Sequence, residues 1–257
     1  MKLSIIMSSF NRPELLRCGL SSWARQDIPC SYEIIVLNDY LSNDKTEEIC
    51  KEFKNKLNIK CIFTGQRNLN NIKWRAPGFA YNIGVKQSKG EFIILTNPEI
   101  YLLEENIVKQ TLNILYKKSK ALVIPHGADD DNKEYLNILK SGKKIDYLAY
   151  NKFYHKLQTK MPFFMGMKRK DFISIGGYDE DFTGFAYDDC DFVYRLKLDN
   201  YEYFQIPSHI IHLNHSRKRK DRLGLNDYKK QYEYNKKLYY ERQGTILRNE
   251  NREWGVL

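Results

Sequence analysis

Continuous apolar runs alternate with amphipathic segments along the first half of the chain. Continuous runs predict buried strands, and apolar residues spaced by three or four positions predict helices. The predicted strands cover residues 3–7, 33–37, 59–63, 91–96 and 121–124. The predicted helices cover residues 13–26, 44–57, 77–87 and 104–118. Strands that alternate with helices favour a mainly parallel sheet covered by helices on both faces.

Local signals support two of the predicted helix starts. Pro13 suits the first position of a helix, where no backbone N–H is needed. Asp44 and Glu47 have the spacing of a capping box, which predicts that the second helix begins there.

The second half of the chain has a different pattern. Residues 127–160 are polar and rich in Lys and Asp, with a weakly helical middle, which indicates an insertion. Residues 217–222 (RKRKDR) form a charge run, and residues 226–242 have the pattern of a Tyr- and Lys-rich amphipathic helix. This helix could contact an anionic membrane surface, or it could pack on the core.

Polar residues follow three of the predicted strands. These clusters are Ser8-Ser9-Phe10-Asn11-Arg12, Asn38-Asp39 and Asn97-Pro98-Glu99. In mainly parallel sheets, ligands bind beyond the carboxyl ends of the strands. We therefore expect the three clusters to meet at one edge of the sheet.

Composition narrows the possible partners and compartment. No apolar run reaches the roughly 18–20 residues that cross a bilayer, and the first residues, MKLSIIMSSFNR, are typical of a strand rather than a signal peptide. The five cysteines are scattered without a CxxC pair, which favours a reducing compartment, so we expect a cytoplasmic protein, with contact at the membrane periphery as an open alternative. The net charge of +10 indicates solubility, an anionic ligand, an anionic membrane surface or nucleic acid.

Four segments resemble the family 2 glycosyltransferases, which have the GT-A fold. The family's first strand and helix resemble SIIMSSFNRPELLRCGLSSWARQ, and its next two motifs resemble EIIVLNDYLSND and GFAYNIGVKQSKGEFIILTNPE. The acceptor-side motif of the galactosyltransferases resembles GGYDEDFTGFAYDDCDF. The segments occur in the family's order and spacing, over roughly residues 1–100 and 160–215.

The resemblance implies an α/β fold of GT-A (Rossmann-like) type, with a mixed, mainly parallel sheet flanked by helices and a C-terminal helical extension. It implies a GT-A domain over residues 1–215, with a nucleotide-binding half (1–100) and an acceptor half (101–215), followed by a basic loop and helix (216–257). The implied activity is inverting transfer of a sugar from a nucleotide-diphosphate sugar to a glycan or lipid-linked acceptor, in polysaccharide or glycoconjugate synthesis. UDP is the default nucleotide, and GDP is the alternative.

The resemblance also implies which residues bind the nucleotide. Asp39 matches the carboxylate that accepts the imide N–H of uracil, and Phe10 matches an aromatic residue that stacks on the base. Ser8 and Ser9 would bond the base or the ribose, and Arg12 ends the same cluster.

One basic residue of the family pattern is replaced in this chain. Where relatives carry an Arg before Asn82, this sequence has Tyr81. Arg75 or Lys73 could compensate, because a guanidinium near a helix N-terminus suits diphosphate oxygens. A solvated surface role for Arg75 is the alternative.

Asn97-Pro98-Glu99 stands where relatives carry an Asp-x-Asp motif that holds Mn²⁺ or Mg²⁺ against the donor diphosphate. Asn97 would bond a ribose hydroxyl, and Glu99 would bind the divalent cation, since hard cations favour oxygen ligands. In HIIHLNH (209–215), at most two of the three histidines can share one face of a strand. We select His215 as a further ligand and His212 as the second choice.

Asp188 and Asp189 match the acid pair of the acceptor motif. The resemblance implies that Asp189 deprotonates the acceptor hydroxyl and that Asp188 binds an acceptor hydroxyl. A helix N-terminus would help to keep Asp189 ionised, and Asp191 would point away from the site. The basic run 217–222 would close over the donor, or would be a solvated charge run.

Two other functions compete with this interpretation. A catalytically inactive GT-A homologue would keep the fold but act as a binding or partner subunit. A nucleic-acid-binding protein would use the positive charge, but no recognised nucleic-acid motif occurs and the basic residues are mostly dispersed, so we expect no nucleic acid partner.

Overall fold

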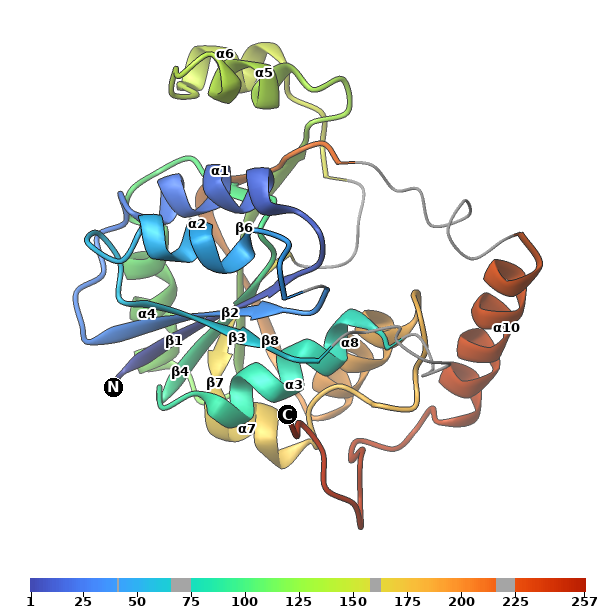
Figure 1. Cartoon of the computed structure of the whole chain (residues 1–257). Coiled ribbons are helices and arrows are strands. Elements are labelled where there is room, and N and C mark those ends of the chain that lie inside the picture. The colour runs from blue at the N-terminus through green and yellow to red at the C-terminus, as the bar shows by residue number, and fades with distance from the viewer. Residues whose placement is uncertain (41, 66–74, 158–162, 216–224) are drawn as a thin grey trace.

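The computed structural model describes residues 1–40, 42–65, 75–157, 163–215 and 225–257. Within these ranges the chain forms an eight-stranded sheet with the order β3-β2-β1-β4-β7-β6-β8-β5 (Figure 1). The strands are β1 (Leu3–Ser9), β2 (Tyr32–Asn38), β3 (Ile59–Phe63), β4 (Phe92–Thr96), β5 (Ile100–Leu102), β6 (Ala121–Asp129), β7 (Phe164–Lys168) and β8 (Glu202–His212).

Helices α1 (Pro13–Trp23), α2 (Thr46–Glu52), α3 (Pro77–Gln87), α4 (Ile107–Lys117) and α7 (Arg169–Ser174) connect or flank these strands. The remaining helices are α5 (Glu134–Lys140), α6 (Tyr147–Lys152), α8 (Asp188–Leu198) and α10 (Leu225–Glu241). In the part of the chain that the structure describes, none of these helices has both the length and the apolar content needed to cross a membrane.

The strand directions determine which loops meet. Neighbours among β3, β2, β1 and β4 are parallel, β7 is antiparallel to both β4 and β6, and β8 runs parallel to β6. The carboxyl ends of these parallel strands, including β6 and β8, therefore lie at one edge of the sheet, which we call the carboxyl edge. Short β5, antiparallel to β8, begins at this edge. The mixed, mainly parallel sheet predicted from the sequence is confirmed.

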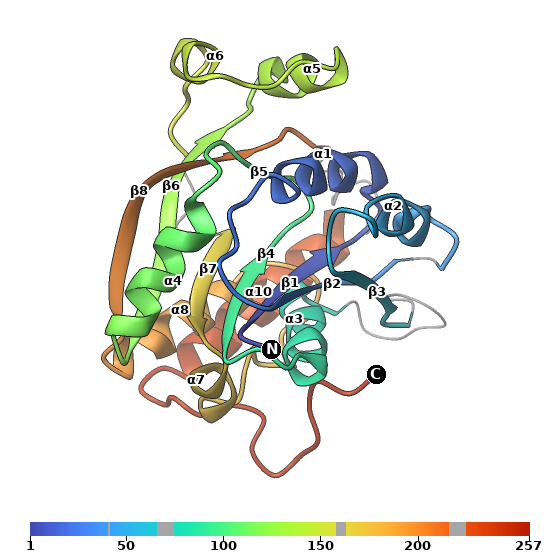
Figure 2. The ribbon, with the colours of Figure 1, turned by 90° about the vertical axis from the view of Figure 1, so that its left-hand side faces the viewer.

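Alternation along the strands builds an apolar core on each face of the sheet. In β1, Ile5 and Met7 pack with α1, α2 and α4, whereas Ile6 packs with α3, α7 and α8. Figures 1 and 2 show α1 and α2 on one side of the sheet and α3 and α7 on the other. Both faces are covered, as the continuous apolar strands predict.

The polar segment after β6 forms a separate layer. Its helices α5 and α6 stand above α1 in both views (Figures 1 and 2). Tyr135 and Tyr150 of these helices pack with Ile211 and Leu213 at the end of β8. The insertion is therefore attached to the carboxyl edge.

Two details of the second helix differ from the prediction. The helix begins at Thr46, not at Asp44, and Lys45 before it has a positive φ of 70°. The Asp44 carboxylate instead accepts bonds from the Thr46 N–H (3.0 Å) and the Asn38 amide (3.1 Å), so the predicted capping box is wrong. The helix ends at Glu52 and residues 53–56 form turns, whereas the sequence predicted a helix to residue 57.

Candidate active site

The carboxyl edge brings together Glu99, His212 and His215. The Nε2 atoms of His212 and His215 lie 3.8 Å and 3.7 Å from Glu99 Oε1. One ligand atom from each of the three residues lies within 4.8 Å of the other two. These are the three residues that the sequence nominated as cation ligands.

Backbone pairing fixes this group. Ile100 of β5 lies opposite His212 of β8, and the Leu213 N–H donates to the Glu99 carbonyl at 2.9 Å. Helix α1 also approaches the segment closely, since a Cβ added at Gly19 would lie 2.4 Å from the Pro98 carbonyl oxygen. A glycine at position 19 therefore allows the Pro98–Glu99 turn to sit against α1.

Glu99 is a buried carboxylate surrounded by basic groups. Its Oε1 forms an ion pair with the Arg12 guanidinium, while its Oε2 has no hydrogen-bond partner among the described residues. Burial alone would raise the pKa of Glu99, but the charges of Arg12, His212 and His215 outweigh it and hold the pKa well below its usual range. Glu99 is therefore ionised and has one oxygen left for a ligand.

His212 has its two ring nitrogens in different roles. Nδ1 lies 2.8 Å from Asp129 Oδ1, while Nε2 makes no hydrogen bond within the described residues. Burial opposes protonation, but the hydrogen bond to Asp129 and the negative charges of Glu99 and Asp129 raise the pKa of His212 above its usual value. Glu99 Oε2 and His212 Nε2 are thus two buried polar atoms of one residue group that lack hydrogen-bond partners among the described residues, which fits a bound cation.

His209, the first histidine of the HIIHLNH segment, has a different role. Its Nδ1 lies 2.6 Å from Glu104 Oε1, and its backbone N–H donates to Glu104 Oε2 at 2.7 Å. The prediction that at most two of the three histidines share one face of a strand does not extend to His215, because β8 ends at His212.

Asp39, predicted to bind the nucleotide base, lies at the end of β2 on the same edge. Asp39 is buried, and its Oδ1 accepts from the Thr64 hydroxyl at 2.7 Å and from Arg75 at 3.1 Å. Arg75 is thus bound to the candidate base-binding carboxylate, and it forms a β-bridge with Thr183 of the acceptor segment. Asp39 and the acceptor motif are therefore linked through one arginine.

The remaining nucleotide-binding candidates lie at the end of β1. Ser8 and Ser9 are buried, and the Phe10 ring packs edge-on against Tyr40 with centroids 5.0 Å apart. Arg12 turns toward Glu99 and so joins the cation group.

Tyr81, which stands where the family has an Arg, contacts the end of β4. Its hydroxyl is within hydrogen-bonding distance of the Thr96 carbonyl and of Asn97 Oδ1. Burial raises the pKa of Tyr81 well above its ordinary value, and the charges of Asp189, Glu99 and Asp188 raise it further.

Helix α8 starts at the acid pair. Asp188 is buried and Asp189 is half-buried, and the two preceding residues, Ala186 and Tyr187, have positive φ angles of 68° and 70°. Such backbone is costly for residues with a Cβ and is concentrated at functional sites. The buried Asn235 side chain of α10 stabilises it by donating to the carbonyl oxygens of this segment.

Asp191 points away from the acid pair, as predicted. It bonds Arg195 at 2.7 Å and Arg248 at 2.6 Å, inside the protein. The predicted C-terminal helix is also present, and it packs on the acceptor segment through Asn235.

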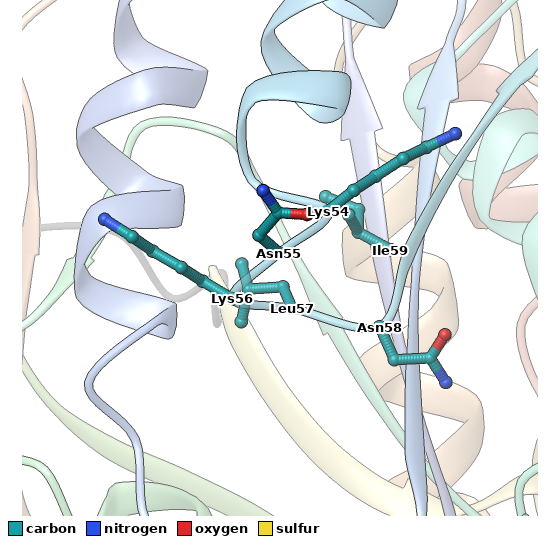
Figure 3. A pocket seen from close by; sticks show the side chains of 6 residues that line it. All are labelled: Lys54, Asn55, Lys56, Leu57, Asn58 and Ile59. Carbon is teal, nitrogen blue, oxygen red and sulfur yellow. The ribbon is translucent and has the colours of Figure 1, made fainter.

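Two expectations lie outside the described residues, namely the closing role of residues 217–222 and the compensation by Lys73. A hollow visible in Figure 3 lies at the amino end of β3, away from the carboxyl edge. It is lined by consecutive residues from Lys54 to Ile59, which include no acid or aromatic ring. We therefore place the site at the carboxyl edge.

Comparison with protein families agrees with this geometry. The family model described as glycosyl transferase family 2 matches residues 4–176. The chain belongs to glycosyl transferase family 2. A second model, described as the N-terminal domain of galactosyltransferase, matches residues 142–219 and so includes the acid pair and both histidines of the cation group.

Curated relatives in family 2 are longer proteins. A poly(ribitol-phosphate) beta-N-acetylglucosaminyltransferase, TarS, of Staphylococcus aureus is 32% identical over 108 residues, which cover 42% of this chain and 18% of TarS. Chondroitin synthase of Escherichia coli is 26% identical over 233 residues, which cover 76% of this chain and 32% of that protein. The matched segments thus span less than a third of the length of each relative.

Solved structures show that the family 2 chain has the GT-A fold. The mannosyltransferase PcManGT of Pyrobaculum calidifontis, solved with GDP-Man and Mn²⁺, has a TM-score of 0.63 at 16% identity, covering 95% of this chain and 65% of PcManGT. S. aureus TarS 1–349, solved with UDP-GlcNAc, has a TM-score of 0.57 at 16% identity, covering 84% of this chain and 60% of the other.

Two residues of the site were not nominated from the sequence. Asp129 bonds a predicted cation ligand, and Thr64 bonds Asp39. Thr64 directly follows the predicted strand 59–63, so the rule that selected Asp39 would also have selected it. Asp129 lies beyond residue 124, where the predicted strand ended, so the rule could not have selected it.

Proposed function

We propose that this protein is an inverting glycosyltransferase that transfers a sugar from a UDP-sugar to a hydroxyl group of a glycan or lipid-linked acceptor. The observation that carries the proposal is the group of Glu99, His212 and His215 at the carboxyl edge, where one ligand atom from each residue lies within 4.8 Å of the other two. Sugar transfer needs a site that neutralises the leaving diphosphate and a base for the acceptor, both close to one sugar.

Asp39 would bind the base of the donor nucleotide. Its carboxylate is held in place by Thr64 and Arg75, and it would accept the imide N–H of uracil, with the Phe10 and Tyr40 rings beside the base. Guanine presents a similar N–H edge, so GDP is the second choice. The TarS structure with UDP-GlcNAc supports UDP, whereas PcManGT was solved with GDP-Man.

The cation would be held by Glu99, His212 and His215. A mixture of carboxylate and imidazole ligands favours Mn²⁺ over Mg²⁺, which prefers oxygen ligands. A divalent cation bound there would neutralise charge on the diphosphate as it leaves. Arg12, paired with Glu99, would add a second positive charge on the same side.

The acceptor would be activated by Asp189. Its carboxylate takes the proton of the acceptor hydroxyl while that oxygen bonds the anomeric carbon from the face opposite the diphosphate. The bond between the anomeric carbon and the diphosphate oxygen breaks, and its electron pair leaves with the nucleoside diphosphate, so the configuration inverts. Asp188 would bind an acceptor hydroxyl, and the N-terminus of α8 favours the ionised form of Asp189.

A thermal-shift screen tests the proposal directly. UDP, GDP and UDP-sugars are each added with Mn²⁺, Mg²⁺ or EDTA, and released UDP is then measured with candidate acceptors. We expect UDP with Mn²⁺ to raise Tm by about 5 °C at a large excess over Kd, and EDTA to remove most of this shift. Absence of any nucleotide-dependent shift would overturn the proposal. Binding without turnover on any acceptor would favour the inactive partner subunit.

A further inference from the structure

Three consecutive acids lie at the end of β6, on the carboxyl edge: Asp129 is its last residue, and Asp130 and Asp131 follow. Each has different neighbours. Asp129 bonds His212, as described above. Asp130 is buried and accepts the N–H groups of Tyr135, Leu136 and Asn214, so it caps α5 and holds the loop before His215. Asp131 is exposed, 3.9 Å from His155.

An irregularity in the sheet brings Asp129 opposite His212. Pro125 of β6 lies opposite Ile206 of β8, but the next residue, His126, lies opposite His209. β8 therefore has two additional residues at this point. In an unbroken register, Asp129 would face Ile210 instead of a histidine. The shift moves β8 by two residues, which preserves the face of each side chain while changing its partner.

The resulting arrangement holds His212 from several sides. β8 lies between β6 and β5, so His212 has Asp129 as one cross-strand neighbour and Ile100, next to Glu99, as the other. The Phe163 ring stacks on the imidazole with a centroid distance of 4.4 Å and an angle of 3° between the planes. Rotation of the ring is therefore restricted.

The Asp129 bond also selects a tautomer. Because a carboxylate accepts at Nδ1, the proton of a neutral His212 resides on Nδ1, and the Nε2 lone pair faces Glu99. This nitrogen and Glu99 Oε2 are both buried and lack a hydrogen-bond partner within the described residues. If the bond between Asp129 and His212 served only to join β6 and β8, His212 Nε2 and Glu99 Oε2 would both stay buried without a partner, which costs free energy.

We propose that Asp129 is the positioning residue of the cation site, fixing the ring orientation and tautomer of His212 so that Nε2 and Glu99 bind one divalent cation. This inference rests on the cation site of the proposed function. Asp129 acts through His212 and does not itself touch the cation.

Mn²⁺ titration of the full chain tests this role, with affinity measured by calorimetry or by the electron paramagnetic resonance of free Mn²⁺, with and without UDP. We expect Asp129→Ala to weaken Mn²⁺ binding by about 10- to 100-fold. Asp129→Asn should have a smaller effect, because the amide oxygen still accepts the Nδ1–H bond but has no charge. Asp131→Ala, two positions along the same segment, is the matched control and should bind like the wild type.

The outcomes separate this inference from the proposed function. If the wild type binds no Mn²⁺, the cation site fails and the inference fails with it. If the wild type binds Mn²⁺ and Asp129→Ala binds it within twofold, only the positioning role is overturned. UDP affinity measured in EDTA should be almost unchanged in the variants. Should Asp129→Ala not fold, an Asp129→Asn protein with wild-type Mn²⁺ affinity overturns the inference.

Discussion

Glu99 and Asp191 are both buried carboxylates with positively charged neighbours, yet their surroundings differ in one respect. Both Asp191 oxygens are bonded to arginines, at 2.7 Å to Arg195 and 2.6 Å to Arg248. Glu99 has one oxygen on Arg12 and the other without a hydrogen-bond partner among the described residues.

The identity of the neighbours explains what each group can do. Arg195 and Arg248 are buried, and each occupies one oxygen of Asp191, so neither oxygen is left for a ligand. The histidines beside Glu99 can lose their protons, and Arg12 has a partly exposed side chain. Ligands can therefore be exchanged at Glu99, whereas the Asp191 network is closed and stabilises the fold.

The largest expected effect concerns Asp189, two residues before Asp191 on α8. Asp189→Asn should lower kcat by about 10²- to 10⁴-fold, because the amide cannot take the acceptor proton. UDP affinity and Tm should stay near those of the wild type. Steady-state rates together with nucleotide titration check this, and unchanged kcat would show that another group is the base.

Breaking the closed network should cost stability. Asp191→Ala leaves Arg195 and Arg248 buried without their carboxylate, and we expect a loss of about 3–5 kcal/mol in the free energy of unfolding. Urea denaturation followed by circular dichroism measures this loss. A decrease below about 1 kcal/mol would mean that the network contributes little.

Removing the charge of Glu99 should have the opposite effect to Asp191→Ala, namely a small loss of stability and a large loss of Mn²⁺ affinity. Glu99→Gln should lower the free energy of unfolding by only about 1 kcal/mol, because Arg12 can turn to solvent and the histidines can be neutral. Mn²⁺ affinity should fall by at least about tenfold. Calorimetry on the same preparation gives both quantities, and retained affinity would exclude Glu99 as a ligand.

A third buried carboxylate, Glu33, allows a smaller test by pH. Burial would raise its pKa, but bonds from the Lys89 N–H, the Ser4 hydroxyl and Lys60 lower it below the usual value. Its stabilising contribution is therefore present at neutral pH and is lost as pH falls through the lowered pKa. Glu33→Gln should reduce the acid-dependent loss of stability by about 1 kcal/mol. Denaturation curves between pH 7 and about pH 3 measure it, and identical pH profiles would contradict the assignment.

The sequence predicted the parallel half of the sheet well, for a physical reason. In β1, β2 and β4 the apolar runs are continuous, so the strand ends are visible and the clusters after them could be located. Glu99 stands in one of these clusters, whereas His212 and His215 were nominated from the family resemblance, and the structure brings the three residues together. Their roles as ligands remain predictions.

The other half of the sheet was harder to predict because long-range pairing decides it. Residues 121–124 were predicted as a strand, but β6 continues to Asp129 through Pro125 and Gly127. Pro and Gly normally weaken a strand, and here the irregularity at Pro125 accommodates them. Asp129 therefore appeared to belong to a polar insertion, and its bond to His212 depends on a register that no local pattern specifies.

The contacts of α10 have a consequence for the order of events during synthesis. The segment 183–187 receives its bonds from Asn235, and Arg248 completes the pairing of Asp191. A nascent chain can assemble β1 to β3 early, since structure forms progressively from the N-terminus during synthesis. The segment before the acid pair, however, acquires its final support only after residue 248 has left the ribosome.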